Sequence, residues 1–121
     1  MSEATKSQGS EAIVTAICDI ADEAKAERIE TVDVRGKTSI ADYFIVCSGN
    51  SDTHVRAIAG RIEDKMRQAK RRPLRVEGAE TGWVLLDFGD VICHVMLESQ
   101  RQFYDLESLW ESMPKRPEYE A

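Results

Sequence analysis

The sequence lacks the features that would tie it to a membrane or to a disulfide framework. No stretch approaches the roughly 20 apolar residues that a helix needs to span a bilayer. Residues 1–10 hold no apolar core of the kind found in a secretory signal peptide. Cys18, Cys47 and Cys93 are an odd number without close pairs, which argues against disulfides and indicates reduced thiols. We therefore expect a cytoplasmic protein.

Motifs for metal binding and for nucleophilic catalysis are also missing. Neither Cys-x-x-Cys nor His-Glu-x-x-His spacing occurs in the chain. Cys93 and His94 are neighbours on an expected strand, so their side chains point to opposite faces and do not easily share a metal. No spacing places a base beside a thiol. We expect no metal site and no catalytic thiol, and we interpret Cys47 and Cys93 as small core hydrophobes.

The chain has fewer basic than acidic residues. Lysine and arginine total 16 against 22 aspartates and glutamates, so the net charge is -6 and the pI is near 4.9. This balance argues against a protein that wraps naked nucleic acid and suits a basic partner. The exception is a basic cluster of Lys65, Arg67, Lys70, Arg71, Arg72 and Arg75. It is either a solvated helix end or a place of glancing contact with the phosphate backbone of a nucleic acid.

What is present is the composition of one globular domain, with 42% hydrophobic residues in 121, enough for a single core. Apolar residues at helical spacing predict two helices, 11–27 with Ser10 as its N-cap and 53–71. A capping box at Ser99 predicts a third helix that ends at Pro114. Apolar and β-branched runs predict strands at 29–34, 43–47, 74–77, 82–88 and 91–97.

The order of these elements, α-β-β-α-β-β-β-α, indicates an α+β domain with a mixed sheet of about five strands and flanking helices. We expect the folded domain to span residues 10–114. A disordered tail precedes it at residues 1–9, and a polar tail follows at residues 115–121.

The last two strands are expected to form a hairpin around a Gly89-Asp90 turn, with Phe88 opposite Val91. The side-chain period of two then defines two faces. The first face carries Val84, Leu86, Phe88, Val91, Cys93 and Val95. The second face carries Trp83, Leu85, Asp87, Ile92, His94 and Met96. Since both faces are largely apolar, the second is either covered by one of the first two helices or left partly exposed as a protein interface. Asp87 needs a partner, and the local candidate on this face is His94.

The loop at Ser48-Gly49 precedes a helix, and such a turn can hold phosphate on free N–H groups. Nucleotidyl transfer would also need paired carboxylates for magnesium. Asp33 stands alone, and Asp87 and Asp90 lie across a tight turn. The simpler interpretation is a strand-to-helix connection with a capped helix, and no cofactor is expected.

Three ordered blocks of the chain resemble one known family. The first is residues 42–46, then Ser48-Gly49, then His54-Val55 with Ala57-Ile58-Ala59. The second is Glu77-Gly78, residues 82–90 and His94. The third is residues 101–107 with Leu109-Trp110. The chain is similar to the bacterial ribosomal silencing factors, which are related to the plant Iojap protein and to mitochondrial assembly factors, and the likeness covers about residues 11 to 114.

This resemblance implies a nucleotidyltransferase-like fold without that fold's catalytic carboxylates and a non-enzymatic role, and it makes rRNA the nucleic acid that the basic cluster would touch. It implies binding to the large ribosomal subunit through ribosomal protein fourteen at the intersubunit face. A protein bound there blocks joining of the small subunit and represses translation when nutrients are scarce. The resemblance also implies a homodimer when the protein is free.

The hairpin and the third helix supply the predicted partner-binding residues. An acidic protein that meets a basic one gains encounter rate and orientation from charge, and aromatic anchors supply most of the affinity. In this prediction Trp83 is the apolar anchor and Asp87 meets a lysine or arginine of the partner. The predicted set is Trp83, Leu85, Asp87, His94, Met96, Arg101 and Tyr104.

Two other functions stay open at this point. One is a small nucleotidyltransferase that uses the Ser48-Gly49 loop. The other is a homo-oligomerisation module, in which the second face packs against its own copy.

Overall fold

The structure, a computed structural model, describes residues 2–36, 41–78 and 82–100, with side chains from Ser10 onward. Residues 98–100 are helical, where the third helix is expected to begin. The rest of that helix, including Arg101 and Tyr104, lies outside the described residues, as does the tail at 115–121. The elements are α1 (Ser2–Glu23), β1 (Glu27–Asp33), β2 (Tyr43–Gly49), α2 (Asp52–Gln68), β3 (Arg75–Glu77), β4 (Trp83–Asp87) and β5 (Val91–Leu97).

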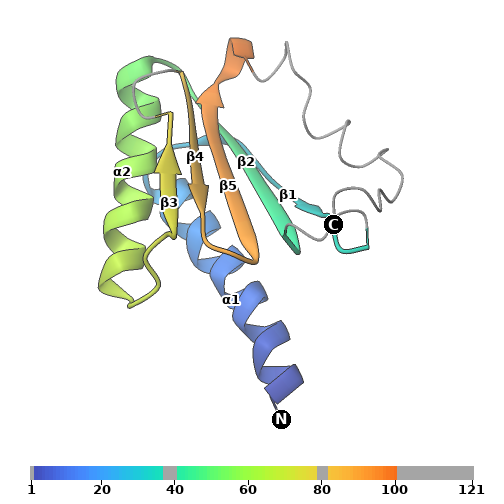
Figure 1. Cartoon of the computed structure of the whole chain (residues 1–121). Coiled ribbons are helices and arrows are strands. Elements are labelled where there is room, and N and C mark those ends of the chain that lie inside the picture. The colour runs from blue at the N-terminus through green and yellow to red at the C-terminus, as the bar shows by residue number, and fades with distance from the viewer. Residues whose placement is uncertain (1, 37–40, 79–81, 101–121) are drawn as a thin grey trace.

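The five strands form one mixed sheet in the order β1-β2-β5-β4-β3. The central strands β2 and β5 run parallel, and every other neighbouring pair is antiparallel. A parallel pair needs a long crossover, which the chain between β2 and β5 supplies with α2, β3 and β4. Helices α1 and α2 lie on the same side of the sheet (Figure 1). The predicted α+β class with a five-stranded mixed sheet is confirmed.

The hairpin has the predicted register. Val84 pairs with Val95, and Leu86 with Cys93. The Phe88 N–H donates to the Val91 carbonyl over 2.8 Å, so the turn is closed by Gly89 and Asp90. Gly89 has a φ of 95°, which a residue with a Cβ rarely adopts. The turn therefore fixes the register, and the register fixes which side chains share a face.

The first face of the hairpin packs against both helices and forms the main core. This core joins Ile17, Ile20 and Ala21 of α1 to the buried face of α2 and to the first-face residues of β4 and β5. The buried α2 residues are Val55, Ile58, Ala59, Ile62 and Met66, at the predicted helical spacing. Burial of these side chains is worth roughly 1.5–3 kcal/mol each before entropy is counted. It commits α1 and α2 to this side of the sheet.

Both helices end earlier than the sequence predicts, at Glu23 and Gln68 instead of 27 and 71. Each ends in a Schellman motif with a left-handed lysine where glycine is usual: Lys25 has φ 68° and Lys70 has φ 64°. The N–H of Ala26 bonds to the carbonyl of Ala21, and other bonds of the same type close α2. Because lysine is not typical of such a cap, the sequence pattern predicted both helix ends too far along the chain. Neither described helix combines the length and apolar character that crossing a bilayer requires.

The predicted N-cap at Ser10 is wrong. The sequence places a tail over residues 1–9, whereas α1 already begins at Ser2. Ser10 lies within the helix, is 3% exposed, and its Oγ donates to the Asp42 carboxylate over 3.1 Å. A serine whose hydroxyl is bonded to a residue far away in the chain is not available to cap a helix. Adding residues to an existing helix also avoids the cost of nucleating a new one. Ser10 therefore ties α1 to the chain before β2.

Alanine substitutions at two glycines are expected to change stability in opposite directions. A Cβ on Gly49 would lie 2.9 Å from both the backbone N and the Cγ2 of Val55, whereas a Cβ on Gly60, inside α2, meets nothing within 4 Å. We expect Gly49→Ala to lower the free energy of unfolding by about 1–2 kcal/mol through overpacking. Gly60→Ala should raise it by up to about 1 kcal/mol through helix propensity. Urea unfolding of the two variants measures both effects, and equal midpoints would contradict the close packing at Gly49.

Candidate functional site

The second face of the sheet carries the predicted partner-binding residues in an ordered grid. Backbone pairing places Trp83 beside Met96, Leu85 beside His94, and Asp87 beside Ile92. The parallel β2 adds Phe44, Val46 and Ser48 on the other side of β5, each opposite an even-numbered β5 residue. The grid therefore has an apolar centre on β2, β5 and β4. Charged residues of β1 and β3 lie at its two ends, with Glu30 opposite Val46 and Arg75 opposite Asp87.

Neither α1 nor α2 covers this face, because both pack against the first one (Figure 1). The folded chain nevertheless buries the middle of the grid: His94 is 4% exposed and Met96 is 0% exposed. The prediction that both present their side chains at the surface is therefore wrong. The second face has a small buried cluster of its own, with Leu85 packed against it, which is formed by Val32, Val34, Ala41, Phe44 and Ile92. Trp83, Leu85 and Asp87, on β4, are partly exposed. The candidate docking residues narrow to this side of the grid.

An aromatic row crosses the second face from β2 to β4. The His94 ring makes edge-on contacts with Phe44 and Trp83, at centroid distances of 5.6 Å and 6.0 Å. The indole Nε1–H of Trp83 donates to His94 Nδ1 over 3.1 Å. Nδ1 therefore carries no proton, and the neutral imidazole has its proton on Nε2. His94 is a buried support that fixes the ring plane of a partly exposed tryptophan.

The protonation state of His94 follows from its burial. Desolvation lowers the pKa of His94 from 6.5 to about 4. Charging the ring would also place a proton on Nδ1 and break its bond from the indole. The ring is therefore neutral at neutral pH, and the position of Trp83 depends on that neutrality.

Asp87 has its partners within the chain, and the prediction that it pairs with His94 is wrong. Its Oδ1 accepts the Gly89 N–H over 2.9 Å, and its Oδ2 lies 3.3 Å from Arg75 Nε. The side chain is 19% exposed, so the pair is only partly screened. Sequence spacing could not show this pairing, because β3 comes beside β4 only through the sheet. Asp87 therefore orders the hairpin turn and ties it to β3.

A shallow hollow of about 320 Å³ opens beside Trp83, between β3 and β4. Glu77, Gly78, Trp83 and Leu85 line it. It combines an indole, an aliphatic side chain and a carboxylate, the mixture found where aromatic anchors meet a basic partner. We refer to these four residues as the Trp83 hollow.

Ser48 and Gly49, predicted to lie in a loop, are instead the last residues of β2, and the helix cap follows them. Ser51 is the N-cap of α2, and its Oγ accepts the N–H of His54. The His54 Nδ1 in turn accepts the Asn50 N–H, and its Nε2 lies 3.1 Å from the Ala24 carbonyl. These bonds use donors that a phosphate would need and tie the start of α2 to the end of α1. Within residues 2–36, 41–78 and 82–100, no three His, Cys, Asp or Glu side chains could hold a metal ion together.

The cysteines sit in or against the main core, as the sequence predicts for Cys47 and Cys93. Both of these side chains are fully buried in it, and Cys18 packs against it from α1. A hydrogen bond with the Cys47 thiol, together with burial, raises the pKa of Cys93 well above its ordinary value. The thiol form is inert towards electrophiles.

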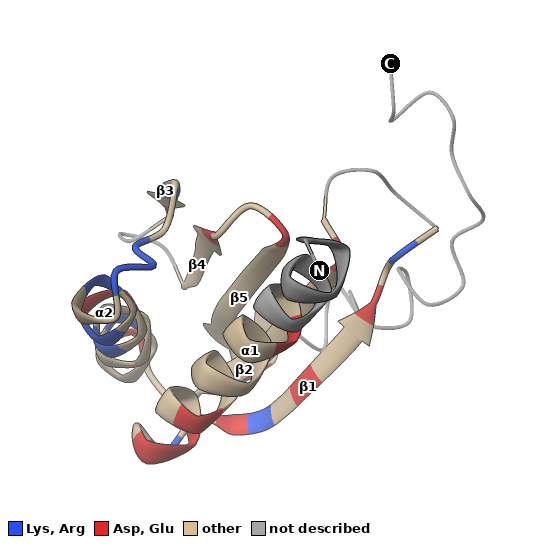
Figure 2. Ribbon diagram, turned by 90° about the horizontal axis from the view of Figure 1, so that it is seen from below, with Lys and Arg blue, Asp and Glu red and all other residues tan. Residues whose placement is uncertain are grey.

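The basic cluster is partly neutralised within the chain. Lys65 lies 3.6 Å from Glu23, Arg67 contacts Glu63 and Asp64, and Arg75 contacts Glu77 and Asp87. These pairs lie near the surface and contribute little to stability. Figure 2 shows that basic residues gather on α2 and the segment after it, whereas acidic residues dominate the end of α1 and β1. The charge of the molecule is therefore divided between two sides.

Comparison with known proteins identifies relatives across the whole fold. A family model described as "Ribosomal silencing factor during starvation" matches residues 7–121. The chain is 42% identical over 103 residues to the ribosomal silencing factor of Bacillus subtilis, covering 84% of this chain and 85% of that protein. It is 32% identical over 90 residues to the chloroplastic Iojap protein of Zea mays, covering 74% of this chain and 40% of that protein. A crystal structure from Chromobacterium violaceum superposes with a TM-score of 0.82 at 31% identity, covering 88% and 90% of the two chains.

Proposed function

The chain belongs to the ribosomal silencing factor family, and from that premise we propose that it represses translation by occupying the large ribosomal subunit. The family is named for a regulatory role and not for a catalytic one. In this proposal the protein binds ribosomal protein fourteen at the intersubunit face and prevents the small subunit from joining when nutrients are limiting. It acts in the cytoplasm, where ribosomes translate.

The Trp83 hollow is the observation that supports this contact. An indole fixed by a buried histidine is a rigid anchor, and rigid anchors lose little conformational entropy on binding. Leu85 extends the apolar contact, and Glu77 places a carboxylate beside it for a basic partner. The net charge of -6 favours encounter with a basic ribosomal protein. Arg101 and Tyr104 remain proposed contacts, as predicted from the sequence.

Sedimentation tests the mechanism directly. We expect the protein to co-sediment with free large subunits and not with small subunits or joined ribosomes, because a steric block excludes the second subunit. Adding the protein before the small subunit should lower the joined fraction, whereas adding it after joining should have little effect. Equal association with joined ribosomes would contradict the steric mechanism.

Homodimerisation through the same hollow is the second candidate, because a partly exposed apolar anchor also suits a twofold contact. Light scattering with and without isolated ribosomal protein fourteen distinguishes the two. If the surfaces coincide, the dimer dissociates as the partner is added. If they differ, a larger complex forms that retains both copies.

A further inference from the structure

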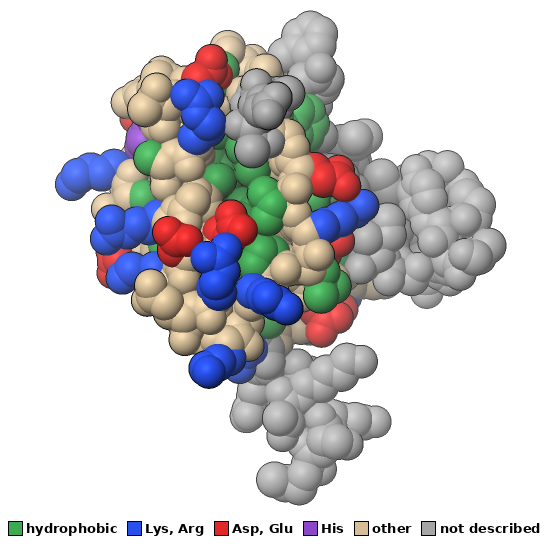
Figure 3. All heavy atoms as spheres, turned by 60° about the vertical axis from the view of Figure 1, so that its left-hand side comes forward, with side chains coloured by type: hydrophobic (Ala, Val, Ile, Leu, Met, Phe, Trp, Pro, Cys, Tyr) green, Lys and Arg blue, Asp and Glu red, His purple; other side chains and the backbone are tan. Residues whose placement is uncertain are grey.

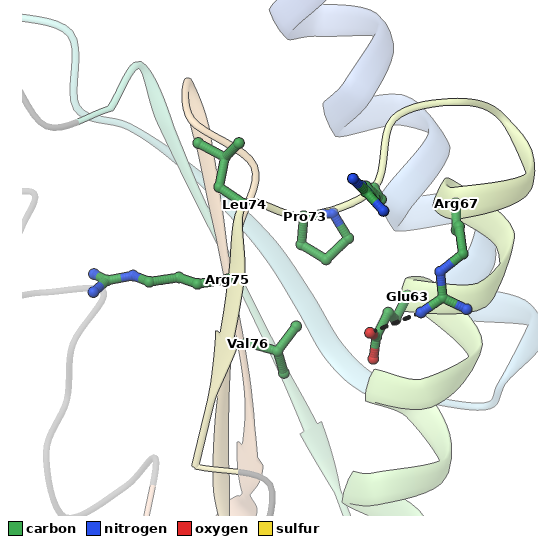
Figure 4. A pocket seen from close by; sticks show the side chains of 7 residues that line it. Glu63, Arg67, Pro73, Leu74, Arg75 and Val76 are labelled. Carbon is green, nitrogen blue, oxygen red and sulfur yellow. Dashed lines mark hydrogen bonds and ion pairs between the residues drawn. The ribbon is translucent and has the colours of Figure 1, made fainter.

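A second concave surface lies on the opposite side of the sheet from the Trp83 hollow. Two hollows of about 470 Å³ and 240 Å³ follow the space between α2 and β3, and they share Glu63 and Val76. We call this surface the α2–β3 groove. Figure 4 shows Val76 pointing from β3 toward α2, while Arg75 points away to the other side of the sheet.

The floor of the groove is apolar and open. Val76 of β3 is partly exposed and forms the accessible part of the floor, and the buried side chains of Val84 and Ala59 border it. Gly60 leaves the backbone of α2 uncovered at this place, because a Cβ there would meet no atom within 4 Å. A glycine in the middle of a helix costs about 1 kcal/mol relative to alanine. The result is space for a backbone or an aliphatic side chain to lie directly against the helix.

The rim of the groove is basic in an otherwise acidic protein. Three arginines, Arg56, Arg67 and Arg72, line the rim against one glutamate, Glu63. Arg75 also borders the first hollow, but its side chain points to the other side of the sheet, where it contacts Asp87 (Figure 4). Arg67 donates to Glu63 over 2.9 Å beside the groove (Figure 4), in an exposed pair that a stronger acceptor could replace. Arg72 has no ion pair within the described part of the chain. Figure 3 shows basic side chains, with a few acidic ones, gathered around an apolar patch on this side.

The neighbouring strand is also an edge. β3 pairs with β4, and no described strand pairs with its outer side. An extended peptide can run along such an edge and place alternate side chains into a groove. The phosphate backbone of RNA would engage the arginines but would make no use of the apolar floor.

We propose that the α2–β3 groove binds an extended protein segment in which acidic and aliphatic side chains alternate. The aliphatic side chains lie on Val76 and the open backbone at Gly60. The acidic side chains meet the arginines of the rim. The site is independent of the Trp83 hollow, because Val76 and Val84 point to the face opposite the one that carries Trp83.

Nuclear magnetic resonance of the ¹⁵N-labelled full chain tests this proposal. The probe is an acetylated and amidated hexapeptide of alternating glutamate and valine. We expect saturable shifts of the Gly60 and Val76 amide signals, with a Kd on the order of 100 μM, while the Trp83 indole signal stays in place. A hexapeptide of alternating lysine and valine should produce no such shifts. Absence of saturable shifts with the acidic peptide would overturn the proposal.

Two variants locate the site without unfolding the protein. Gly60→Leu fills the open space and improves helix propensity, so it should remain folded and weaken binding at least tenfold. Gly60→Ala is the matched control and should bind within about threefold of wild type, because a methyl group leaves most of the groove open. Unchanged binding by a folded Gly60→Leu variant would overturn the assignment. So would a uridine hexanucleotide that shifts the same amides at lower concentration than the acidic peptide, since the groove would then be a nucleic-acid site.

Discussion

Trp83→Ala should weaken binding to the large ribosomal subunit by at least about 2 kcal/mol, or roughly thirtyfold in Kd. The substitution removes the aromatic side chain among the described residues that line the Trp83 hollow, and truncation of a central aromatic anchor commonly has an effect of this size. Trp83→Phe should lie between the variant and wild type, because it keeps a ring but loses the N–H that bonds to His94. Sedimentation binding with purified large subunits gives the three affinities.

Leu74→Ala is the matched control for this experiment. Leu74 is a large hydrophobic residue with 75% exposure, and it lines the α2–β3 groove and not the Trp83 hollow. Its truncation should leave subunit binding within about twofold of wild type if apolar contact is specific to Trp83. Circular dichroism establishes that all variants are folded. Wild-type binding by a folded Trp83→Ala protein would remove the hollow from the proposed interface.

Acidification should destabilise the protein through His94 by up to about 3 kcal/mol between pH 6.5 and pH 4. Burial lowers the pKa of this residue to about 4 in the folded chain, whereas the unfolded chain titrates near 6.5. Below pH 6.5 His94 binds a proton in the unfolded state but not in the folded state, so the free energy of unfolding falls as the pH falls. The loss stops below pH 4, where both states are charged. The full stabilisation is present above pH 6.5.

The variant His94→Gln isolates this contribution. Glutamine can accept the indole N–H through its carbonyl and has no charge at any of these pH values. Both proteins contain the same carboxylates, so the difference between their stability curves reports the histidine alone. In urea unfolding at pH 7, 6, 5 and 4 the wild type should lose stability faster than the variant on acidification, by about 1.4 kcal/mol per pH unit at the steepest part. Parallel curves would show that His94 titrates alike in both states.

Local chemistry explains why the hairpin was predictable in detail. The Gly89-Asp90 turn lies between two apolar runs, and a two-residue turn leaves one register for the arms. The period of two then placed Val84 and Leu86 in the core, and Trp83 and Leu85 on the other face. The helical face of α2 was equally readable, because every buried position follows the helical period.

The errors came from contacts between segments far apart in the chain. The local sequence suggests that Ser10 caps a helix, but the fold brings Asp42, 32 residues later, beside it as a hydrogen-bond partner. Within the hairpin, His94 is the candidate partner of Asp87, but β3 brings Arg75 beside Asp87 in the folded chain. Phe44 gave no sign of belonging to the aromatic row, since its contact with His94 depends on the parallel pairing of β2 with β5.

The sequence by itself determined the elements, the hairpin register and the two faces, because turn chemistry and side-chain period act over a few residues. Only the tertiary structure decided which side of the second face stays accessible. It sealed His94 and Met96 at the centre of the sheet and left Trp83 and Leu85 at the β4 side. The physical reason is that exposure depends on the neighbours a strand acquires, and strand order is set by long-range packing that no local pattern encodes.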